Sequence, residues 1–330
     1  MNEPQIVAIV LNWNGIAIKY RDEPILKVTL TTLKKVNYKN LKVIVTDAES
    51  EDGSQEFVKS NFKDFDLLEV KNEGFGYANN RAIEYAFKKY KNLDYILLLN
   101  DDLIFNETGW LKKLVKAGEK LSDVGIVGCK LKYPDGRVCE AGSYSEKFYT
   151  LVNIKNKNKK AGYVKAVIGA VFLIKKEVIQ KIGCFDEIYL PFFKEETDFC
   201  ERALINGYKT YYVNNTNITH LESYSVMKYD IKKKWTKEQI VYFSLRNDWI
   251  FLFRWYKKFI FFNALYNTIQ AFIRIDPEFG IRPFNEIIMR LKFNILGFVK
   301  ALRTYGKFNI PIIPRNKILM KILYVYLFLG

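Results

Sequence analysis

The stretch DYILLLNDDLIF, residues 94–105, places two acidic side chains directly after an apolar run. Residues 95–99 are aromatic or aliphatic, and Asn100, Asp101 and Asp102 follow them before the apolar pattern resumes. A continuous apolar run is typical of a strand buried on both faces of a parallel sheet. Carboxylates are costly to bring close to such a core. Asp and Asn also favour turns and helix caps, so position alone leaves a structural and a functional role open.

Further short apolar runs predict the other strands of this sheet. They are residues 6–11, 42–46, 125–130 and 167–174. Between them, residues 77–90 repeat apolar side chains at helical spacing. This alternation predicts an α/β fold with a mainly parallel sheet flanked by helices. In open parallel sheets, ligands bind beyond the carboxyl ends of the strands, so residues 100–102 are expected to open into a crevice.

Two polar segments predict loops. YPDG, residues 133–136, predicts the turn of an inserted hairpin, because Pro, Asp and Gly favour turn geometries. NIKNKNKK, residues 153–160, has no apolar residue after Ile154 and predicts a mobile loop.

The chain of 330 residues is 49% hydrophobic and 27% charged, which is typical of a folded globular protein of one or two domains. Its net charge of +16 is unevenly distributed. Residues 231–330 hold 18 Lys or Arg and 5 Asp or Glu, together with 22 of the 52 aromatic residues. A basic, aromatic-rich region of this kind suggests an anionic partner. The candidates are a membrane surface, a nucleic acid and a polyanionic substrate. A solvated face on an ordinary helical subdomain is the simpler alternative.

The four cysteines have no C-x-x-C spacing, which argues against a zinc site or a disulfide framework and for a reducing compartment. The first residues, MNEPQIVAIVLNWNG, lack a basic region followed by a long apolar one, so no signal peptide is expected. The longest uncharged stretch of the C-terminal region, residues 259–273, has 15 residues and includes polar side chains. It is too short to predict a membrane-spanning helix.

Three further segments place polar residues after predicted strands or at the start of helices: 45–54, 72–86 and 192–208. His220, the only histidine, follows them. A single histidine is usually structural, but an imidazole with one or two carboxylates and substrate phosphate oxygens suits a divalent cation. Neither a Walker A sequence nor a G-x-G-x-x-G after the first strand is present.

Seven short motifs occur in a fixed order along the chain. They are VLNWNG (10–15), DAESEDGS (47–54), NEGFGYANN (72–80), LLNDD (98–102), GAVFLIKKEVIQKIGCFDE (169–187), EETDFCER (195–202) and HLESYS (220–225). In this order they resemble the motifs of the family-2 glycosyltransferases of the GT-A fold, especially the rhamnosyltransferase-like branch. The resemblance implies a GT-A catalytic domain over residues 1–230. It leaves residues 231–330 as a basic, aromatic-rich helical region, for which membrane association is expected.

The resemblance implies transfer of a sugar from a nucleotide-diphosphate donor to a hydroxyl of a glycan or lipid-linked acceptor, with inversion at the anomeric carbon. The donor would carry UDP, dTDP or GDP. The departing diphosphate is negatively charged, and a bound Mg²⁺ or Mn²⁺ would neutralise that charge. By the family pattern, Asp102 and His220 are the metal ligands.

The family pattern also implies contacts to the donor nucleotide. Trp13 matches an aromatic residue that stacks on the base, and Asp47 matches an acid that accepts a hydrogen bond from a pyrimidine N–H. Asn100 or Asp101 would lie near the ribose and phosphates. Asn80, the last residue of the Gly/Asn-rich motif, is assigned to the same donor site.

Direct displacement needs a general base on the face opposite the leaving group, because a hydroxyl is a poor nucleophile at neutral pH. Glu196 matches the second acid of the family's E-D-x-D motif, which has this role. Glu195 and Asp198 are expected to shape the pocket or to hold Arg202. Helix-dipole stabilisation of acids at a helix start is the structural alternative. Three departures from the family pattern are Ala48 in place of the usual Asn, Asn100 in place of a possible first acid, as in many members of this branch, and Glu196 itself in place of the more frequent Asp.

The composition of residues 231–330 fits peripheral attachment to an anionic membrane, with aromatic rings in the interface and Lys and Arg at the head groups. We therefore expect a cytoplasmic enzyme at the inner face of the cell membrane, acting in polysaccharide or cell-envelope biosynthesis without a nucleic-acid partner. A nucleotidyltransferase is an alternative, but NWNGIAIKY supplies only Gly15 and Lys19 of the basic Gly-rich signature that it needs. A non-catalytic membrane- or nucleic-acid-binding protein would explain the charge but not the polar strand ends.

Overall fold

The centre of the molecule is a mixed, ten-stranded β-sheet. The computed structural model describes residues 3–140, 143–146, 150–153, 160–221, 234–256, 275–276, 280–281 and 284–306. Across the sheet, the strands are β12 (Gly162–Val164), β14 (Lys209–His220), β8 (Val124–Lys132), β13 (Val171–Lys175), β6 (Tyr95–Asn100), β1 (Ile6–Asn12), β4 (Leu41–Ala48) and β5 (Asp66–Val70). Two more strands lie off this path: β7 (Leu103–Phe105) pairs with β14, and β9 (Val138–Glu140) pairs with β8.

The strands that matter for the site are parallel. β4, β1 and β6 pair in parallel, and so do β14 and β8, whereas β13 is antiparallel to both of its neighbours. The expected mainly parallel α/β sheet is therefore confirmed. The YPDG turn is also confirmed, because β8 and β9 are the two strands of a hairpin around it and the Tyr133 N–H donates to the Arg137 carbonyl over 2.8 Å.

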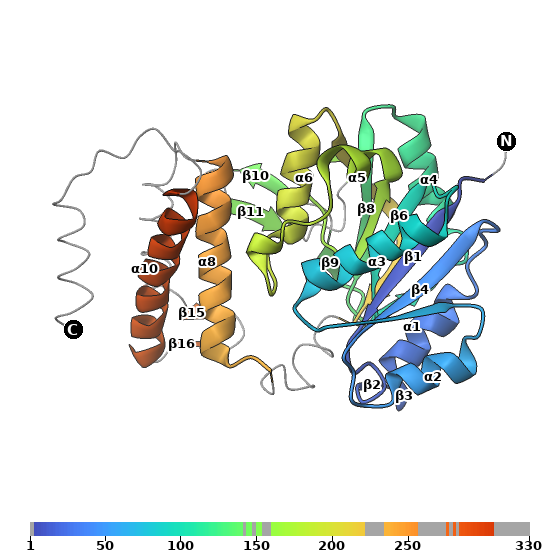
Figure 1. Cartoon of the computed structure of the whole chain (residues 1–330), viewed down its shortest axis with the longest axis horizontal. Helices are drawn as coiled ribbons and strands as arrows, with labels where there is room; N and C mark the ends of the chain where they lie inside the picture. The colour runs from blue at the N-terminus through green and yellow to red at the C-terminus, as the bar shows by residue number, and fades with distance from the viewer. Residues whose placement is uncertain are drawn as a thin grey trace.

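Helices cover both faces of the sheet (Figure 1). They are α1 (Ile25–Leu33), α2 (Ser54–Asn61), α3 (Phe75–Lys89), α4 (Trp110–Lys120), α5 (Lys176–Ile182) and α6 (Glu195–Ile205), with the short 3₁₀ helix η1 (Glu187–Tyr189) between the last two. Alternate residues of β1 enter two different cores: Ala8 packs with α1 and α4 residues, and Ile9 packs with α3 and α6 residues. This burial on both faces explains why β1 and β6 are continuously apolar in sequence.

The expected strand over 167–174 begins later than predicted. β13 starts at Val171, and the residues before it form a turn. Val167 is nevertheless buried, because it packs on Gly128, where an added Cβ would lie 2.5 Å from the Val167 Cβ. Its apolar character thus reflects burial in a turn and not strand pairing.

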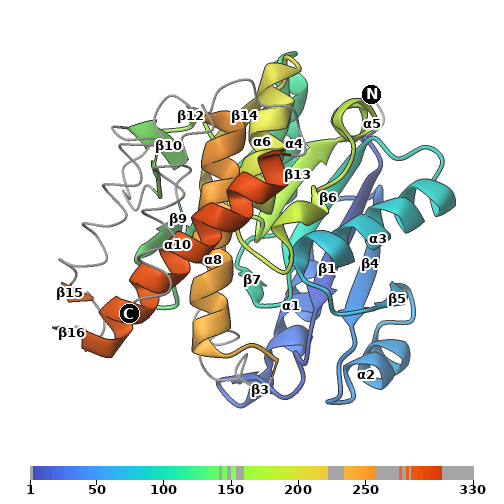
Figure 2. The ribbon, with the colours of Figure 1, turned by 60° about the vertical axis from the view of Figure 1, so that its left-hand side comes forward.

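Two long helices lie beside the sheet domain (Figure 1), and in Figure 2 they cross each other. They are α8 (Lys237–Trp255) and α10 (Phe284–Gly306). Their shared core includes Trp249 and Ala301 together with Tyr189 from η1. The close crossing needs Gly297, since a Cβ there would lie 3.0 Å from the Arg246 backbone. The helical prediction for the C-terminal region is thus confirmed where that region is described, whereas the domain boundary at residue 230 stays a prediction.

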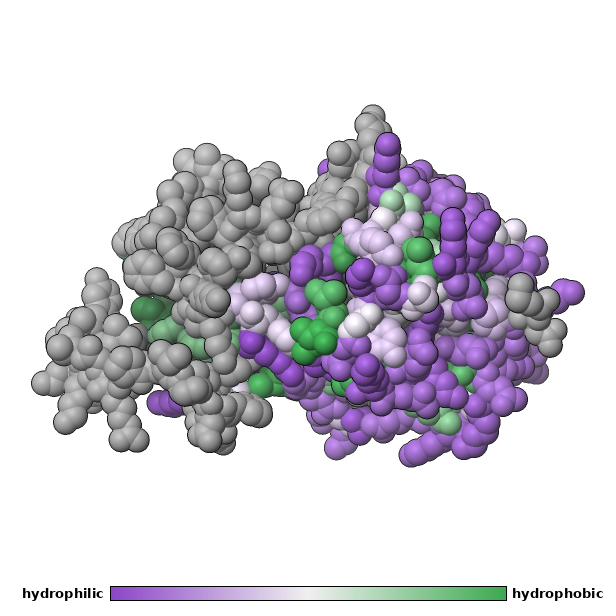
Figure 3. Space-filling view, turned by 90° about the horizontal axis from the view of Figure 1, so that it is seen from above, coloured by the Kyte–Doolittle hydropathy of each residue, from purple (hydrophilic) through white to green (hydrophobic). Residues whose placement is uncertain are grey.

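The remaining described strands are short pairs: β2 (Lys19–Tyr20) with β3 (Glu23–Pro24), β10 (Ser143–Glu146) with β11 (Thr150–Asn153), and β15 (Ile275–Asp276) with β16 (Gly280–Ile281). No described helix combines the length and apolarity needed to cross a membrane. The stretch 259–273, the loop segment 154–159 and residues 222–225 of the last motif lie outside the described residues. The described surface over the sheet domain is mainly hydrophilic in Figure 3.

Candidate active site

The carboxyl ends of neighbouring parallel strands bring the predicted donor-site residues to one edge of the sheet. In the strand register, Asn12 of β1 pairs with Asp47 of β4, and Leu11 of β1 pairs with Asn100 of β6. Asn12 and Asp47 thus lie side by side, and Asn100 lies one position earlier in the register at the same edge, although the three come from separate sequence motifs. This is the edge at which α/β folds of this type bind ligands.

Asp102 and His220 lie beside each other at this edge, as the sequence motifs predicted. Asp102 is in the tight connection between β6 and β7, and β14 runs antiparallel to β7 so that His220 pairs with Leu103. The Leu221 N–H also donates to the Asp102 carbonyl over 2.9 Å. As a result, His220 Nε2 lies 3.2 Å from Asp102 Oδ1, with both side chains almost fully buried.

The surroundings of His220 favour a positive charge on it. Burial lowers the pKa of the imidazole, but the Asp102 carboxylate more than compensates and raises this pKa to about 10. Cys139 Sγ of the hairpin lies 3.7 Å from Nδ1, and Asn100 Nδ2 lies 3.5 Å from Nε2. In the metal-free chain, the Asp102–His220 contact is therefore an ion pair.

The Asp102–His220 pair fits a divalent cation as two ligands of a larger set. Adjacent ligands of an octahedral ion with bonds of about 2.1 Å lie about 3 Å apart, which matches the 3.2 Å separation of Oδ1 and Nε2. Within the described part of the chain, no group of three or more His, Cys, Asp and Glu residues could hold a metal ion. A cation bound here would take its remaining ligands from other oxygen atoms, such as those of water or of a substrate.

Asp101 faces the loop after β1 and not the Asp102–His220 pair. Its Oδ2 accepts from the Trp13 N–H over 3.4 Å, and burial, followed by the nearby Asp102 charge, raises its pKa well above the usual range. Gly15 is needed in this loop, because a Cβ there would lie 2.4 Å from Asn12 Oδ1 and 3.1 Å from Asp101 Oδ2. Trp13 itself is half-buried at the same loop.

The backbone of the acidic turn is fixed by Thr29 of α1. Its hydroxyl donates to the carbonyls of Asp101 (2.7 Å) and Leu103 (2.9 Å), and the Leu103 N–H donates to it (3.0 Å). Thr29 was not predicted from the sequence, because a buried Thr in an amphipathic helix gives no functional signal.

Asp47 is buried and already has four hydrogen bonds. Its carboxylate accepts from Asn12 Nδ2 (2.6 Å), from the Ser50 N–H (2.9 Å) and hydroxyl (2.7 Å), and from Gln55 Nε2 (2.7 Å). Both oxygens thus have two donors each, which is their usual capacity. A direct contact of Asp47 with a nucleotide base stays a prediction, and it requires one of these bonds to be replaced.

The rest of the DAESEDGS motif holds the loop after β1. The Asn14 N–H donates to the Ser50 hydroxyl over 2.8 Å, and the Ile16 and Ala17 N–H groups both donate to Asp52 Oδ2 over 2.7 Å. Two adjacent sequence motifs therefore form one hydrogen-bonded unit, which fixes the loop that carries Trp13.

Asn80 is in α3, and its side chain forms hydrogen bonds with the turn at residues 185–187. Its Nδ2 donates to the Phe185 carbonyl (3.0 Å) and to Glu187 Oε1 (3.1 Å), and its Oδ1 accepts from the Phe185 N–H (2.9 Å). The side chain is thus engaged with residues 185–187, and a direct contact with the donor stays a prediction.

The start of α6 carries the two adjacent acids, Glu195 and Glu196, and lies against the start of α3. An added Cβ at Gly76 would lie 3.3 Å from Glu195 Cγ, and one at Gly74 would overlap the Pro191 backbone. These contacts explain the glycines of the NEGFG segment. Glu195 is 1% exposed, and its Oε1 has no hydrogen-bond partner among the described residues.

Burial changes the acidity of both glutamates. It raises the pKa of Glu195 well above the usual value, and the neighbouring Glu196 charge raises it further. Burial also raises the pKa of Glu196, against the opposing effect of the Lys194 ammonium. Glu196 is only half-buried, so part of this residue remains accessible to solvent.

Asp198 holds Arg202, as expected. Its Oδ2 accepts from Arg202 Nε over 2.8 Å, whereas its Oδ1 accepts from the Tyr189 hydroxyl (3.1 Å) and from Trp255 Nε1 (2.8 Å). The link to Trp255 connects the sheet domain to α8, and no sequence pattern indicated this contact.

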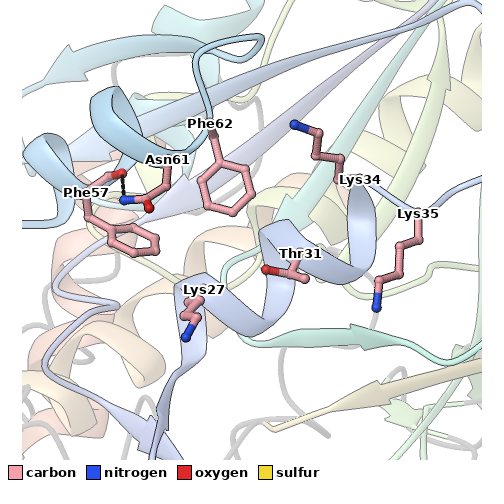
Figure 4. A pocket seen from close by; sticks show the side chains of 7 residues that line it. All are labelled: Lys27, Thr31, Lys34, Lys35, Phe57, Asn61 and Phe62. Carbon is pink, nitrogen blue, oxygen red and sulfur yellow. Dashed lines mark hydrogen bonds between the residues drawn. The ribbon is translucent and has the colours of Figure 1, made fainter.

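A surface pocket between α1 and α2 contains none of the predicted site residues (Figure 4). Its lining side chains are Lys27, Thr31, Lys34, Lys35, Phe57, Asn61 and Phe62.

Comparison with known proteins identifies the family of this chain. The family model for glycosyl transferase family 2 matches residues 16–183, and the chain therefore belongs to this family. An N-acetylglucosaminyl-diphospho-decaprenol L-rhamnosyltransferase of Mycobacterium tuberculosis is 21% identical over 238 residues, which cover 64% of this chain and 76% of that protein. The O-antigen biosynthesis protein RfbC of Myxococcus xanthus is 24% identical over 226 residues, which cover 64% of this chain and 17% of that protein.

The fold is also that of solved glycosyltransferases. The crystal structure of GalNAc-T7 with UDP, GalNAc and Mn²⁺ superposes with a TM-score of 0.58 at 14% sequence identity, over 95% of this chain and 59% of that chain. The predicted GT-A fold is thereby confirmed. The chain spans only about a fifth of the length of two of its curated relatives, 22% and 17%.

Proposed function

We propose that the chain transfers a sugar from a nucleotide-diphosphate donor to a hydroxyl of a glycan or lipid-linked acceptor, with inversion at the anomeric carbon. The observation that carries this proposal is the buried Asp102–His220 pair at the carboxyl ends of the parallel strands. Family membership supports it and disfavours the nucleotidyltransferase and the purely binding alternatives.

Asp102 and His220 would hold a Mg²⁺ or Mn²⁺ ion, which supplies charge neutralisation for the departing diphosphate. Trp13, on its half-buried loop, would stack on the base of a UDP, dTDP or GDP group. Asn100 Nδ2 lies 3.5 Å from His220 Nε2, and Asn100 would contact the ribose or phosphates at the same edge.

Glu196 is the proposed general base. A base works best when its pKa is close to the working pH, and burial moves the Glu196 pKa upward in that direction. Its carboxylate would accept the proton of the acceptor hydroxyl as the oxygen attacks the anomeric carbon. The bond from that carbon to the diphosphate oxygen breaks at the same time, and the electron pair leaves with the diphosphate.

The relatives suggest an acceptor class. One acts as an L-rhamnosyltransferase on a diphospho-decaprenol, and another is an O-antigen biosynthesis protein. We therefore propose a hexose or deoxyhexose donor and an acceptor of polysaccharide or cell-envelope biosynthesis. Peripheral attachment at the inner face of the cell membrane would give access to a lipid-linked acceptor.

A donor screen tests the proposed function. The full chain is incubated with UDP-, dTDP- and GDP-sugars, Mg²⁺ or Mn²⁺ and candidate glycan acceptors, and release of nucleoside diphosphate is measured. We expect one donor class to be consumed in an acceptor-dependent way, with at least about a 100-fold loss in Asp102→Asn. Asp64→Asn is the matched control, because the Asp64 side chain is 80% exposed in a surface ion pair. Equal rates in Asp102→Asn and the control would contradict the proposal.

A further inference from the structure

The turn that precedes the proposed base has an unusual backbone. Phe193 and Lys194 both have a φ of +77°, although neither is glycine. L-residues visit this left-handed region rarely, and two in succession persist only where the surroundings enforce them. Lys194 is directly followed by the first turn of α6, which carries Glu196. The orientation of the first turn of α6, and with it the direction of the Glu196 side chain, therefore depends on this turn.

The side chain that enforces the turn comes from the distant helix α8. Asn247 is fully buried, and its Nδ2 donates to the carbonyls of Tyr189, Phe192 (2.8 Å) and Phe193 (3.1 Å). Its Oδ1 accepts from Arg246 Nε over 2.9 Å, which fixes the orientation of the amide.

The neighbours of Asn247 in the sequence complete the support. The Arg246 guanidinium donates to the Leu190 carbonyl, and Lys194 Nζ lies 2.9 Å from Asp248 Oδ1. Three consecutive residues of α8 thus contact the turn. Arg246 and Asn247 bind its backbone carbonyls, and Asp248 pairs with the Lys194 ammonium group. None of these contacts involves the donor-site edge formed by β1, β4 and β6.

We propose that Asn247 is a positioning residue for Glu196, and that α8 is part of the catalytic machinery through its contacts with residues 190–194. This inference rests on the proposed function. Without Asn247, Phe193 and Lys194 relax toward negative φ, and the first turn of α6 turns its base away from the acceptor. Donor binding, at the other end of the site, is unaffected.

The test compares Asn247→Asp with wild type in the full chain. This substitution keeps the shape but replaces the donating amide with a carboxylate that faces three carbonyls. We expect kcat to fall by about 30-fold or more, which is part of the roughly 10²–10⁴-fold that a general base contributes, with the donor KM changed by less than about threefold. A displaced Glu196 becomes more hydrated, so its pKa falls and the acid limb of the pH–kcat profile moves to lower pH. Amide hydrogen exchange of residues 189–196 becomes faster.

Two further variants separate positioning from general stability. Adding Phe193→Gly to Asn247→Asp should restore part of kcat, because glycine adopts a positive φ without strain. Asp248→Asn removes only the ion pair with Lys194, so it folds even where Asn247→Asp does not, and it should lower kcat by a smaller factor with the same unchanged donor KM. Arg303→Gln on the exposed side of α10 is the control and should match wild type.

The outcomes are distinct. Two results would overturn the positioning role while sugar transfer by the wild-type chain continues. One is a wild-type kcat in both Asn247→Asp and Asp248→Asn. The other is an equal loss of kcat and donor affinity with no rescue by Phe193→Gly. Absence of sugar transfer in the wild-type chain overturns the proposed function, and the positioning role with it.

Discussion

At the scale of single residues, Glu195 and Glu196 show how neighbouring acids differ in environment. Glu195 is almost fully buried against the start of α3, whereas Glu196 is half-buried and accessible. The pKa of each is raised, and Glu195 has a buried carboxylate oxygen without a hydrogen-bond partner among the described residues. The buried acid thus lowers stability at neutral pH, while the accessible one is suited to proton transfer.

Glu195→Gln should stabilise the fold, and more so at higher pH. Because the folded-state pKa of Glu195 is raised, the folded chain binds more protons than the unfolded chain above the ordinary pKa, so stability falls as pH rises. Removing the charge should raise Tm by a few degrees at pH 7.5 and by less at pH 5, as measured by calorimetry. Glu56→Gln, at an exposed position of α2, is the control. An equal shift in Tm at both pH values would contradict this account.

Gly15→Ala should damage the donor edge. The new Cβ would approach Asn12 Oδ1 to 2.4 Å and Leu26 Cβ to 2.9 Å, and the resulting overpacking costs about 1–3 kcal/mol. Displacing Asn12 also disturbs its bond to Asp47, so the affinity for nucleoside diphosphate should fall by about tenfold or more, as measured by calorimetric titration. Gly162→Ala is the matched control, because nothing lies within 4 Å of a Cβ there. The prediction is wrong if both variants bind alike.

Some of these residue-scale contacts could be predicted from the sequence, and others could not. Asp102 and His220 were predictable because each occupies a motif position with a recognisable chemistry. Asn247 was not, because an Asn within a long helix has no pattern that reveals its partners in residues 189–193. Asp47 was predicted to be a site residue, but its four internal hydrogen bonds could not be inferred from spacing.

At the scale of secondary-structure elements, α6, η1 and α8 meet at Asp198. This fully buried carboxylate pairs with Arg202 of its own helix, Tyr189 of η1 and Trp255 of α8, and Arg254 Nη1 lies 3.3 Å away. Strand positions were largely predictable, because strands buried on both faces are continuously apolar. The packing of α8 on η1 and α6 was not, because it depends on polar side chains and not on periodicity.

Asp198→Ala should therefore cost about 3–5 kcal/mol of unfolding free energy, since it leaves several buried donors, including a charged one, without an acceptor. Urea denaturation at neutral pH measures this loss. Asp186→Ala is the matched control, because Asp186 pairs with the same Arg254 over 2.6 Å but is 35% exposed. It should cost about 1–2 kcal/mol, because it removes an exposed ion pair and the cap that Asp186 Oδ1 provides to the Ile188 N–H of η1. Similar losses in the two variants would show that Asp198 does not join these elements.

At the scale of the whole molecule, the excess positive charge and the polar edge of the sheet lie in different parts of the sequence. Residues 231–330 hold 18 basic and 5 acidic residues, and the polar edge of the sheet lies in the first 230 residues. The structure also shows that part of the C-terminal region, α8, packs on the sheet domain. Truncating the chain near residue 230 would therefore remove structural contacts as well as charge, and only the full chain gives a clean test of membrane binding.

The full chain should bind anionic vesicles in a salt-dependent way. The Debye length falls from about 8 Å at 0.15 M salt to about 3 Å at 1 M, so electrostatic attraction to anionic head groups weakens strongly. Co-sedimentation with vesicles containing about 30% anionic lipid should fall several-fold over this range. Vesicles of purely zwitterionic lipid are the control and should bind weakly at both concentrations. Binding that is insensitive to both salt and lipid charge would rule out the electrostatic attachment.

The contacts of α8 with residues 189–193 also affect the order in which the protein matures. A ribosome synthesises the whole sheet, including Asp102, His220 and Glu196, before it reaches Asn247. The nascent polypeptide can thus bring Asp102 and His220 together early, while the turn before Glu196 still lacks its support. This turn gains its hydrogen bonds only after the part of α8 around Asn247 has emerged.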